Sequence, residues 1–180
     1  MATNLYVENY QPEIKWARKV ESKLGGSFGG SLTVTGNVTS LSQVIDETAN
    51  ATLTQAQSGS VVLLDVASGA TITLPAPAVG IVYTFAVVTT VTSNAYKIIT
   101  NAGTVLLAGS LLSASNNLAS KSFLGDGSSH VSINMAAASS NATGGIIGSV
   151  FQLLCLTTTL WAVDGSNISS ATPTTPFGTS

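Results

Sequence analysis

Charged side chains become scarce in this chain after residue 23. Four of its six basic residues lie before that point, and the rest of the 180-residue chain carries two lysines and five acids. Charged residues make up 8% of the whole, where an ordinary soluble domain has about 25%. Serine and threonine take their place, and a surface of this kind loses little rotamer entropy in a permanent contact. The sequence therefore predicts a short charged segment followed by a long body suited to packing against copies of itself.

The charged segment has the pattern of an amphipathic helix. Trp16, Val20 and Leu24 recur at every fourth position, which predicts a helix of about three turns that ends at Leu24. A helix this short is marginal in water and needs a surface to lie on. The expected organisation is an N-terminal arm, residues 1–24, that is extended before this short helix, followed by a flexible glycine-rich hinge, residues 25–30.

Short strand signals fill the body, with turn residues between them. The strand candidates are residues 31–36, 60–66, 70–74, 81–89, 96–100, 104–108, 130–135, 150–157 and 160–163. Several of them alternate polar and apolar side chains, as a half-buried strand does. In the longest, Tyr83, Phe85 and Val87 share one face.

This spacing of strands, without helical segments between them, is typical of all-β folds. We expect an antiparallel β-sandwich, or a jelly-roll or barrel-like fold, over residues 31–165. Residues 166–180 are rich in serine, threonine and proline, which predicts a flexible tail.

Residues with catalytic or metal-binding chemistry are few and scattered. The single histidine, His130, follows a turn and is expected to be hydrogen-bonded or solvent-facing. The single cysteine, Cys155, lies in an apolar run and is expected in the core;. No carboxylate pair or cluster of metal ligands stands out. We therefore expect no enzyme activity, no metal and no cofactor.

The charge balance and hydropathy exclude two kinds of partner. A net charge of −2 offers no basic face for nucleic acid. No apolar run approaches the roughly 18 residues that a membrane helix needs, and the first residues lack the pattern of a secretory signal. We expect a protein made in a cytoplasm, with neither nucleic acid nor membrane as a partner.

The arm combines aromatic, branched and basic side chains, a mixture typical of binding hot spots. It could bind a partner or pack on its own body. The glycine-rich hinge loosens docking within the chain and favours a partner. The expected partner-binding residues are Tyr6, Tyr10, Ile14, Lys15, Trp16, Arg18 and Lys19.

Three phrases of the body give a resemblance to a known class of virion protein. They are Gly-Ala-Thr-Ile-Thr-Leu-Pro-Ala-Pro at residues 69–77, Gly-Ile-Val-Tyr-Thr-Phe at 80–85 and Leu-Trp-Ala-Val-Asp-Gly at 160–165. Roughly residues 50–165 resemble the small proteins that decorate or cement the heads of tailed bacteriophages. The resemblance implies a homotrimer on the outer surface of the capsid that clamps neighbouring capsomers and stabilises the shell. It also implies an N-terminal arm that reaches over the major capsid protein.

The same phrases resemble some phage fibre modules, which leaves an alternative open. A head- or tail-fibre module would bind host surface glycan, through an exposed Trp161 or exposed tyrosines. A third class, an enzyme or lectin-like domain acting on polysaccharide, would need a carboxylate pair or a metal in a pocket, and the sequence offers neither.

Overall fold

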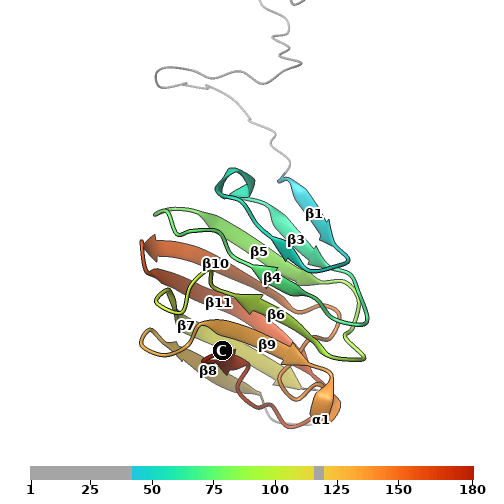
Figure 1. Cartoon of the computed structure of the whole chain (residues 1–180). Helices are drawn as coiled ribbons and strands as arrows, with labels where there is room; N and C mark the ends of the chain where they lie inside the picture. The colour runs from blue at the N-terminus through green and yellow to red at the C-terminus, as the bar shows by residue number, and fades with distance from the viewer. Residues whose placement is uncertain (1–41, 116–119) are drawn as a thin grey trace, which may run out of the picture. The chain divides into compact units, whose positions relative to one another are not determined.

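The computed structural model describes residues 42–115 and 120–180, in which two β-sheets pack as a sandwich (Figure 1). The seven-stranded sheet contains, in spatial order, β1 (Val44–Glu47), β3 (Val61–Leu64), β5 (Val82–Val87), β10 (Val150–Thr157), β11 (Leu160–Ser169), β7 (Leu106–Ser115) and β8 (Lys121–Asp126). The five-stranded sheet contains β12 (Phe177–Gly178), β9 (Ser132–Ala136), β6 (Ala95–Ile99), β4 (Thr71–Thr73) and β2 (Ala51–Thr52). The helices in the described ranges are a 3-10 turn, Gln55–Gln57, and α1, Ala138–Asn141. The prediction of a β-sandwich is confirmed at this level.

Successive strands alternate between the two sheets from β1 to β7. Because β2 and β4 lie in the opposite sheet, β1, β3 and β5 run parallel to one another, as do β2, β4 and β6. The β7–β11 pair is also parallel, whereas β10 is antiparallel to both β5 and β11. The predicted antiparallel pairing was therefore wrong, and both sheets are mixed. The chain coils between the sheets instead of forming hairpins there, so neighbouring strands keep the same direction.

Aromatic side chains form the centre of the core. Tyr83, Phe85 and Val87 point inward from β5, as predicted, and none is more than 2% exposed. The Phe85 ring stacks on that of Phe151 on β10, with centroids 5.5 Å apart. Cys155 lies on the same side of β10 and is 1% exposed, which confirms its place in the core.

The C-terminal residues belong to the sandwich. β11 continues to Ser169 and β12 pairs with β9, so the boundary expected at residue 165 lies inside a strand. The alternation of apolar residues ends early because β11 turns a polar side chain, Asn167, inward. Its amide oxygen accepts from the backbone N–H of Gly145, and its amide nitrogen donates to the carbonyl of Thr143. These bonds satisfy a buried amide that would otherwise be costly.

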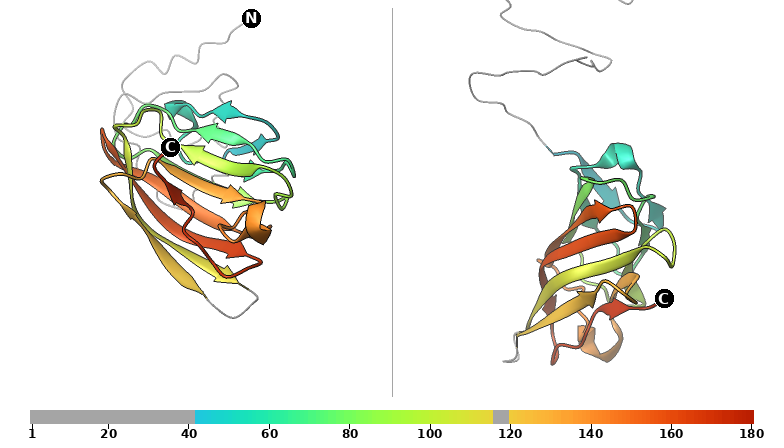
Figure 2. Two further views of the ribbon diagram at one scale, coloured as in Figure 1. Left: turned by 60° about the horizontal axis from the view of Figure 1, so that its bottom comes forward. Right: turned by 90° about the vertical axis from the view of Figure 1, so that its left-hand side faces the viewer.

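Figure 2 shows the two sheets from two further sides. The described residues belong to one compact unit, residues 41–180. The predicted arm, its helix, the hinge and the strand candidate at 31–36 lie outside the described residues.

Candidate interaction surface

The seven arm residues that the sequence singles out are not placed by the structure. Tyr6, Tyr10, Ile14, Lys15, Trp16, Arg18 and Lys19 all lie outside the described residues. Their role stays a prediction. The described part of the chain offers a second candidate, the solvent-facing side of the seven-stranded sheet, which we call the outer face.

The outer face is built from the side chains that alternate with the core residues of each strand. On β10 these are Val150, Gln152, Leu154 and Leu156, while Phe151, Leu153 and Cys155 point inward. Val150, Leu154 and Leu156 are 44%, 37% and 45% exposed. A strand with apolar residues on both sides, at the centre of its sheet, places apolar side chains in water unless something covers them.

The strand register aligns the outer-face residues in three rows that run across the sheet. Each row takes one residue from each strand that it crosses, and we call these rows ranks. The first rank contains Asp46, Leu63, Ala86, Val150, Ser166, Leu112 and Ser122. The second contains Val44, Val61, Thr84, Gln152 and Asp164 and, across a gap in the β11–β7 pairing whose register is the same on both sides, Ser110 and Leu124. The third contains Val82, Leu154, Ala162, Ala108 and Asp126. Two mainly apolar ranks therefore flank one that is polar at its centre.

The outer face carries three carboxylates and, among the described strands, no basic side chain. Asp46, Asp126 and Asp164 lie in the three ranks given above. Lys97 lies in the five-stranded sheet, and Lys121 alternates with the outer-face residues of β8. Sequence reasoning missed this surface. The sequence indicates this surface in the run Val150 to Leu156, where the inward-facing and the outward-facing residues are both mainly apolar.

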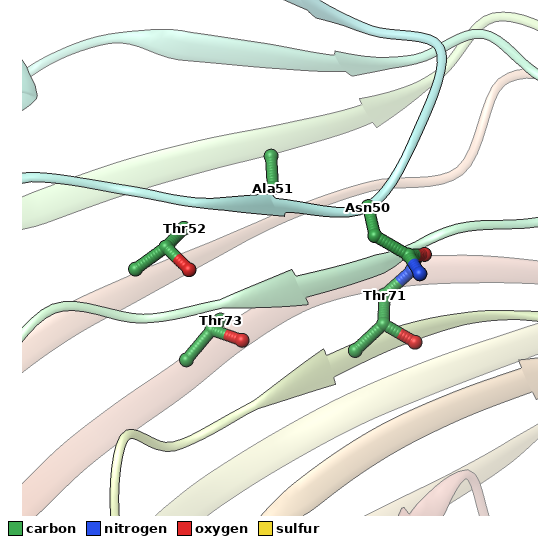
Figure 3. Close-up of a pocket in the computed structure, with 5 residues that line it drawn as sticks. All are labelled: Asn50, Ala51, Thr52, Thr71 and Thr73. Atoms are coloured by element: carbon green, nitrogen blue, oxygen red, sulfur yellow. The ribbon is translucent and has the colours of Figure 1, made fainter.

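The five-stranded sheet presents a different, hydroxyl-rich surface. Asn50, Ala51, Thr52, Thr71 and Thr73 line an open hollow of about 330 Å³ (Figure 3). The Asn50 side chain accepts a hydrogen bond of 2.7 Å from the backbone N–H of Thr71. These groups can donate and accept hydrogen bonds, but the lining has no carboxylate, histidine or cysteine for acid–base or nucleophilic chemistry.

His130 is held in a hydrogen-bonded turn, as expected. Its Nδ1 atom accepts from the backbone N–H of Asp126 at 3.1 Å. The Ser129 hydroxyl donates to the Asp126 carboxylate at 2.5 Å, and the backbone N–H groups of Ser128, Ser129 and His130 donate to it as well. The Ser129 hydroxyl, followed by these N–H groups, holds the pKa of Asp126 well below its usual range;. The serine is bound to the aspartate, so this turn does not have the order of a Ser-His-Asp triad.

The pattern Gly-x-Ser-x-Gly occurs once in the sequence, at residues 25–29. It lies outside the described residues and follows a predicted helix, whereas a nucleophile elbow follows a strand. It therefore lacks the expected context of a hydrolase serine.

The expected route to glycan binding, through an exposed Trp161 or exposed tyrosines, was wrong for Trp161 and for the two tyrosines that the structure describes. Trp161, Tyr83 and Tyr96 are each 0% exposed, so none can stack on a sugar. Tyr6 and Tyr10 lie outside the described residues.

Two further kinds of site are absent from the described residues. Within residues 42–115 and 120–180 no group of three or more His, Cys, Asp or Glu side chains could hold a metal ion. No helix in these ranges is long and apolar enough to cross a membrane. Comparison of the chain with protein-family models, curated proteins and solved structures finds no match.

Proposed function

We propose that this chain is a structural virion protein that binds the outer surface of a tailed-phage capsid as a homotrimer. In this role it clamps neighbouring capsomers and stabilises the shell, and its partner is the major capsid protein. The observation that carries the proposal is the outer face: a broad, weakly charged surface with exposed apolar side chains on its central strand. Such a surface suits a permanent contact between proteins.

The two parts of the chain have complementary tasks in this proposal. The body joins the copies, and the arm, which contains four of the six basic residues, binds the capsid. A trimer presents three arms at once, so that arms with modest affinity together hold the shell tightly.

A fibre module that binds host glycan is the second candidate. The observation in its favour is the hydroxyl-rich hollow beside Thr71 and Thr73, because sugar hydroxyls are recognised through hydrogen bonds of this kind. Binding of host polysaccharide by the isolated chain, and its loss in Thr71→Ala, would favour this candidate over the first.

Deletion of residues 1–24 tests the proposed function. We expect the full chain to co-sediment with shells of the major capsid protein and the truncated chain to stay in the supernatant. The β-sheet circular dichroism of the truncated chain should match that of the full chain, because the sandwich is one compact unit from residue 41 onward.

Lys121→Glu is the matched control for this deletion. It alters an exposed charge on β8, far along the sequence from the arm, and should leave capsid binding unchanged. Undiminished binding by the truncated chain would rule out the arm as the capsid-binding element.

A further inference from the structure

The solvent side of the five-stranded sheet carries one lysine among hydroxyl and amide groups. We propose that this side binds a saccharide whose sugar units carry carboxylates. The inference goes beyond the proposed capsid role, and it rests on the second candidate function, for which it names the class of ligand.

The strand register places four polar side chains in one line across this sheet, which we call the lysine row. Thr71 of β4 pairs with Lys97 of β6, and Lys97 pairs with Asn134 of β9. Residues opposite each other on neighbouring strands project to the same side of a sheet. Asn50 extends the line beyond Thr71, because its side chain accepts the hydrogen bond from the Thr71 backbone N–H. The lysine row therefore contains Asn50, Thr71, Lys97 and Asn134.

The lysine row faces away from the core. Ile72 and Ile98, which follow Thr71 and Lys97 along their strands, are both 0% exposed. Because side chains alternate along a strand, Thr71 and Lys97 lie on the solvent side of the sheet. Both are half-buried, and Asn134 is exposed. A ligand that lies across the sheet can thus reach all three side chains.

The open hollow of about 330 Å³ adjoins the lysine row (Figure 3). Thr71 belongs to both, and Thr52 and Thr73, which pair with each other across β2 and β4, also line the hollow. A threonine hydroxyl can donate one hydrogen bond and accept others, so it can bind a sugar hydroxyl in either sense. The volume lies at the lower end of the range for small-ligand sites, which suits a sugar ring.

Charged side chains are divided unequally between the two sheets. All five acids in the described ranges belong to the seven-stranded sheet or directly follow one of its strands: Asp46, Glu47, Asp65, Asp126 and Asp164. The strands of the five-stranded sheet contain Lys97 and no acid. Within residues 42–115 and 120–180 the ion pair is that of His130 with Asp126, and Lys97 forms none. Its ammonium group is therefore available to an anion from outside the described residues.

A sugar with a carboxylate supplies the partners that this surface lacks. Its carboxylate can accept a charge-assisted hydrogen bond from Lys97. Its ring hydroxyls can bond to Thr71 and Asn134, which lie one strand away on either side, about 4.8 Å from Lys97. A neutral sugar would leave the ammonium group without a partner, and nucleic acid needs several basic side chains where this sheet provides one.

Three polymers of similar length test the class of ligand. Polygalacturonate carries a carboxylate on each sugar unit, dextran is a neutral sugar polymer, and polyglutamate carries carboxylates without sugars. We expect the full chain to bind polygalacturonate most tightly in isothermal titration calorimetry at about 50 mM NaCl, where salt screens the charges little. Repeated sugar units make a weak single contact measurable.

Lys97→Gln and Lys121→Gln form a matched pair of variants. Each removes one positive charge, and the arm with its four basic residues is the same in both, so its own attraction to acidic polymers cancels in the comparison. Lys97→Gln should lower the affinity for polygalacturonate about fivefold, the upper end for an exposed ion pair. Lys121→Gln, on β8 of the seven-stranded sheet, should leave it unchanged. Circular dichroism spectra that match the original chain show that both variants fold.

Amide resonances give a local readout that does not depend on the arm. Titration of the isotope-labelled full chain with digalacturonate should shift the amide signals of Thr71, Thr73 and Lys97. The signals of β10, Val150–Thr157, should stay in place, because this strand lies in the other sheet.

The outcomes separate this inference from both candidate functions. Equal affinities of the two lysine variants, or equal binding of polyglutamate, would overturn it, because charge alone would then attract the polymer. Equal binding of dextran would overturn the preference for carboxylates and still support the second candidate. Lys97→Gln should co-sediment with capsid shells as the original chain does. Failure of the original chain to bind shells would overturn the capsid role and leave this surface to be judged by the polymers.

Discussion

Tyr83 and Tyr96 bring hydroxyl groups to the edge of the core and use them to hold neighbouring loops. The Tyr83 hydroxyl donates to the carbonyl of Thr54 at 2.7 Å. The Tyr96 hydroxyl donates to the carbonyl of Thr89 and accepts from the backbone N–H of Val66. Burial raises the pKa of Tyr83 to about 12 and also raises the pKa of Tyr96;. Both side chains are therefore bound in their neutral form.

This burial predicts a loss of stability in alkaline solution. The pKa of Tyr83 is 10.0 without the fold and about 12 within it. The unfolded chain thus releases its proton first, and the free energy of unfolding should fall as the pH rises from about 10 to about 12. Tyr83→Phe should lower the free energy of unfolding by about 1 kcal/mol at neutral pH. Above pH 10, the free energy of unfolding of this variant should fall less steeply than that of the original protein. Urea titrations followed by circular dichroism at several pH values measure both effects, and an equal fall in the two proteins would contradict this account.

At the scale of elements, the sequence predicted strands best where apolar, β-branched and aromatic residues recur between turn residues. β5 and β10 were predicted in this way, although both carry apolar residues on both sides. The end of β11 was not, because its inward side chain, Asn167, is polar and is satisfied by the loop before β10. β8 was not predicted because Gly125 occupies one of its inward positions. A Cβ atom at this residue would lie 2.9 Å from the carbonyl oxygen of Leu107, so the missing side chain leaves room for that carbonyl.

The direction of strand pairing could not be predicted, for a physical reason. Alternation shows which side of a strand is buried but not which strand lies beside it. Short connections suit both a hairpin and a crossing to the opposite sheet, and the chain uses crossings from β1 to β7. The ranks of the outer face could not be predicted either, because they depend on this register, although the run Val150 to Leu156 indicated a strand with apolar residues on both sides.

β12 lies in the segment that was predicted to be a flexible tail, yet it pairs with β9 in the five-stranded sheet. Phe177 is 6% exposed, and its ring lies 5.5 Å from that of His130. Phe177→Ala should lower the free energy of unfolding by about 3 kcal/mol, as for other buried phenylalanines. Thr179→Ala, at an exposed position two residues further on, should change it by less than about 0.5 kcal/mol. Equal denaturation midpoints for the two variants would show that β12 contributes nothing to stability.

At the scale of the whole molecule, the proposal divides binding between two surfaces of opposite character. The outer face has few charges, whereas the arm, residues 1–24, contains four of the six basic residues of the chain. Salt screens the attraction between exposed charges but leaves apolar contact largely intact.

The two kinds of contact should therefore respond differently to salt. Between about 50 mM and about 500 mM NaCl, the mass of the free protein should stay that of a trimer, while its affinity for capsid shells should fall. Light scattering and co-sedimentation across the same salt series measure the two responses. Dissociation of the trimer at high salt would show that charges hold the copies together.

The place of β10 in the sheet has a consequence for how the protein is made. β10 and β11 join the strands β1, β3 and β5 to the strands β7 and β8, yet β10 begins only at residue 150. Until the ribosome has passed that point, the sheet consists of two separate pieces with unpaired edges. A chain stopped earlier has no complete outer face. If copies meet there, synthesis itself ensures that finished subunits enter the trimer and truncated ones are left out.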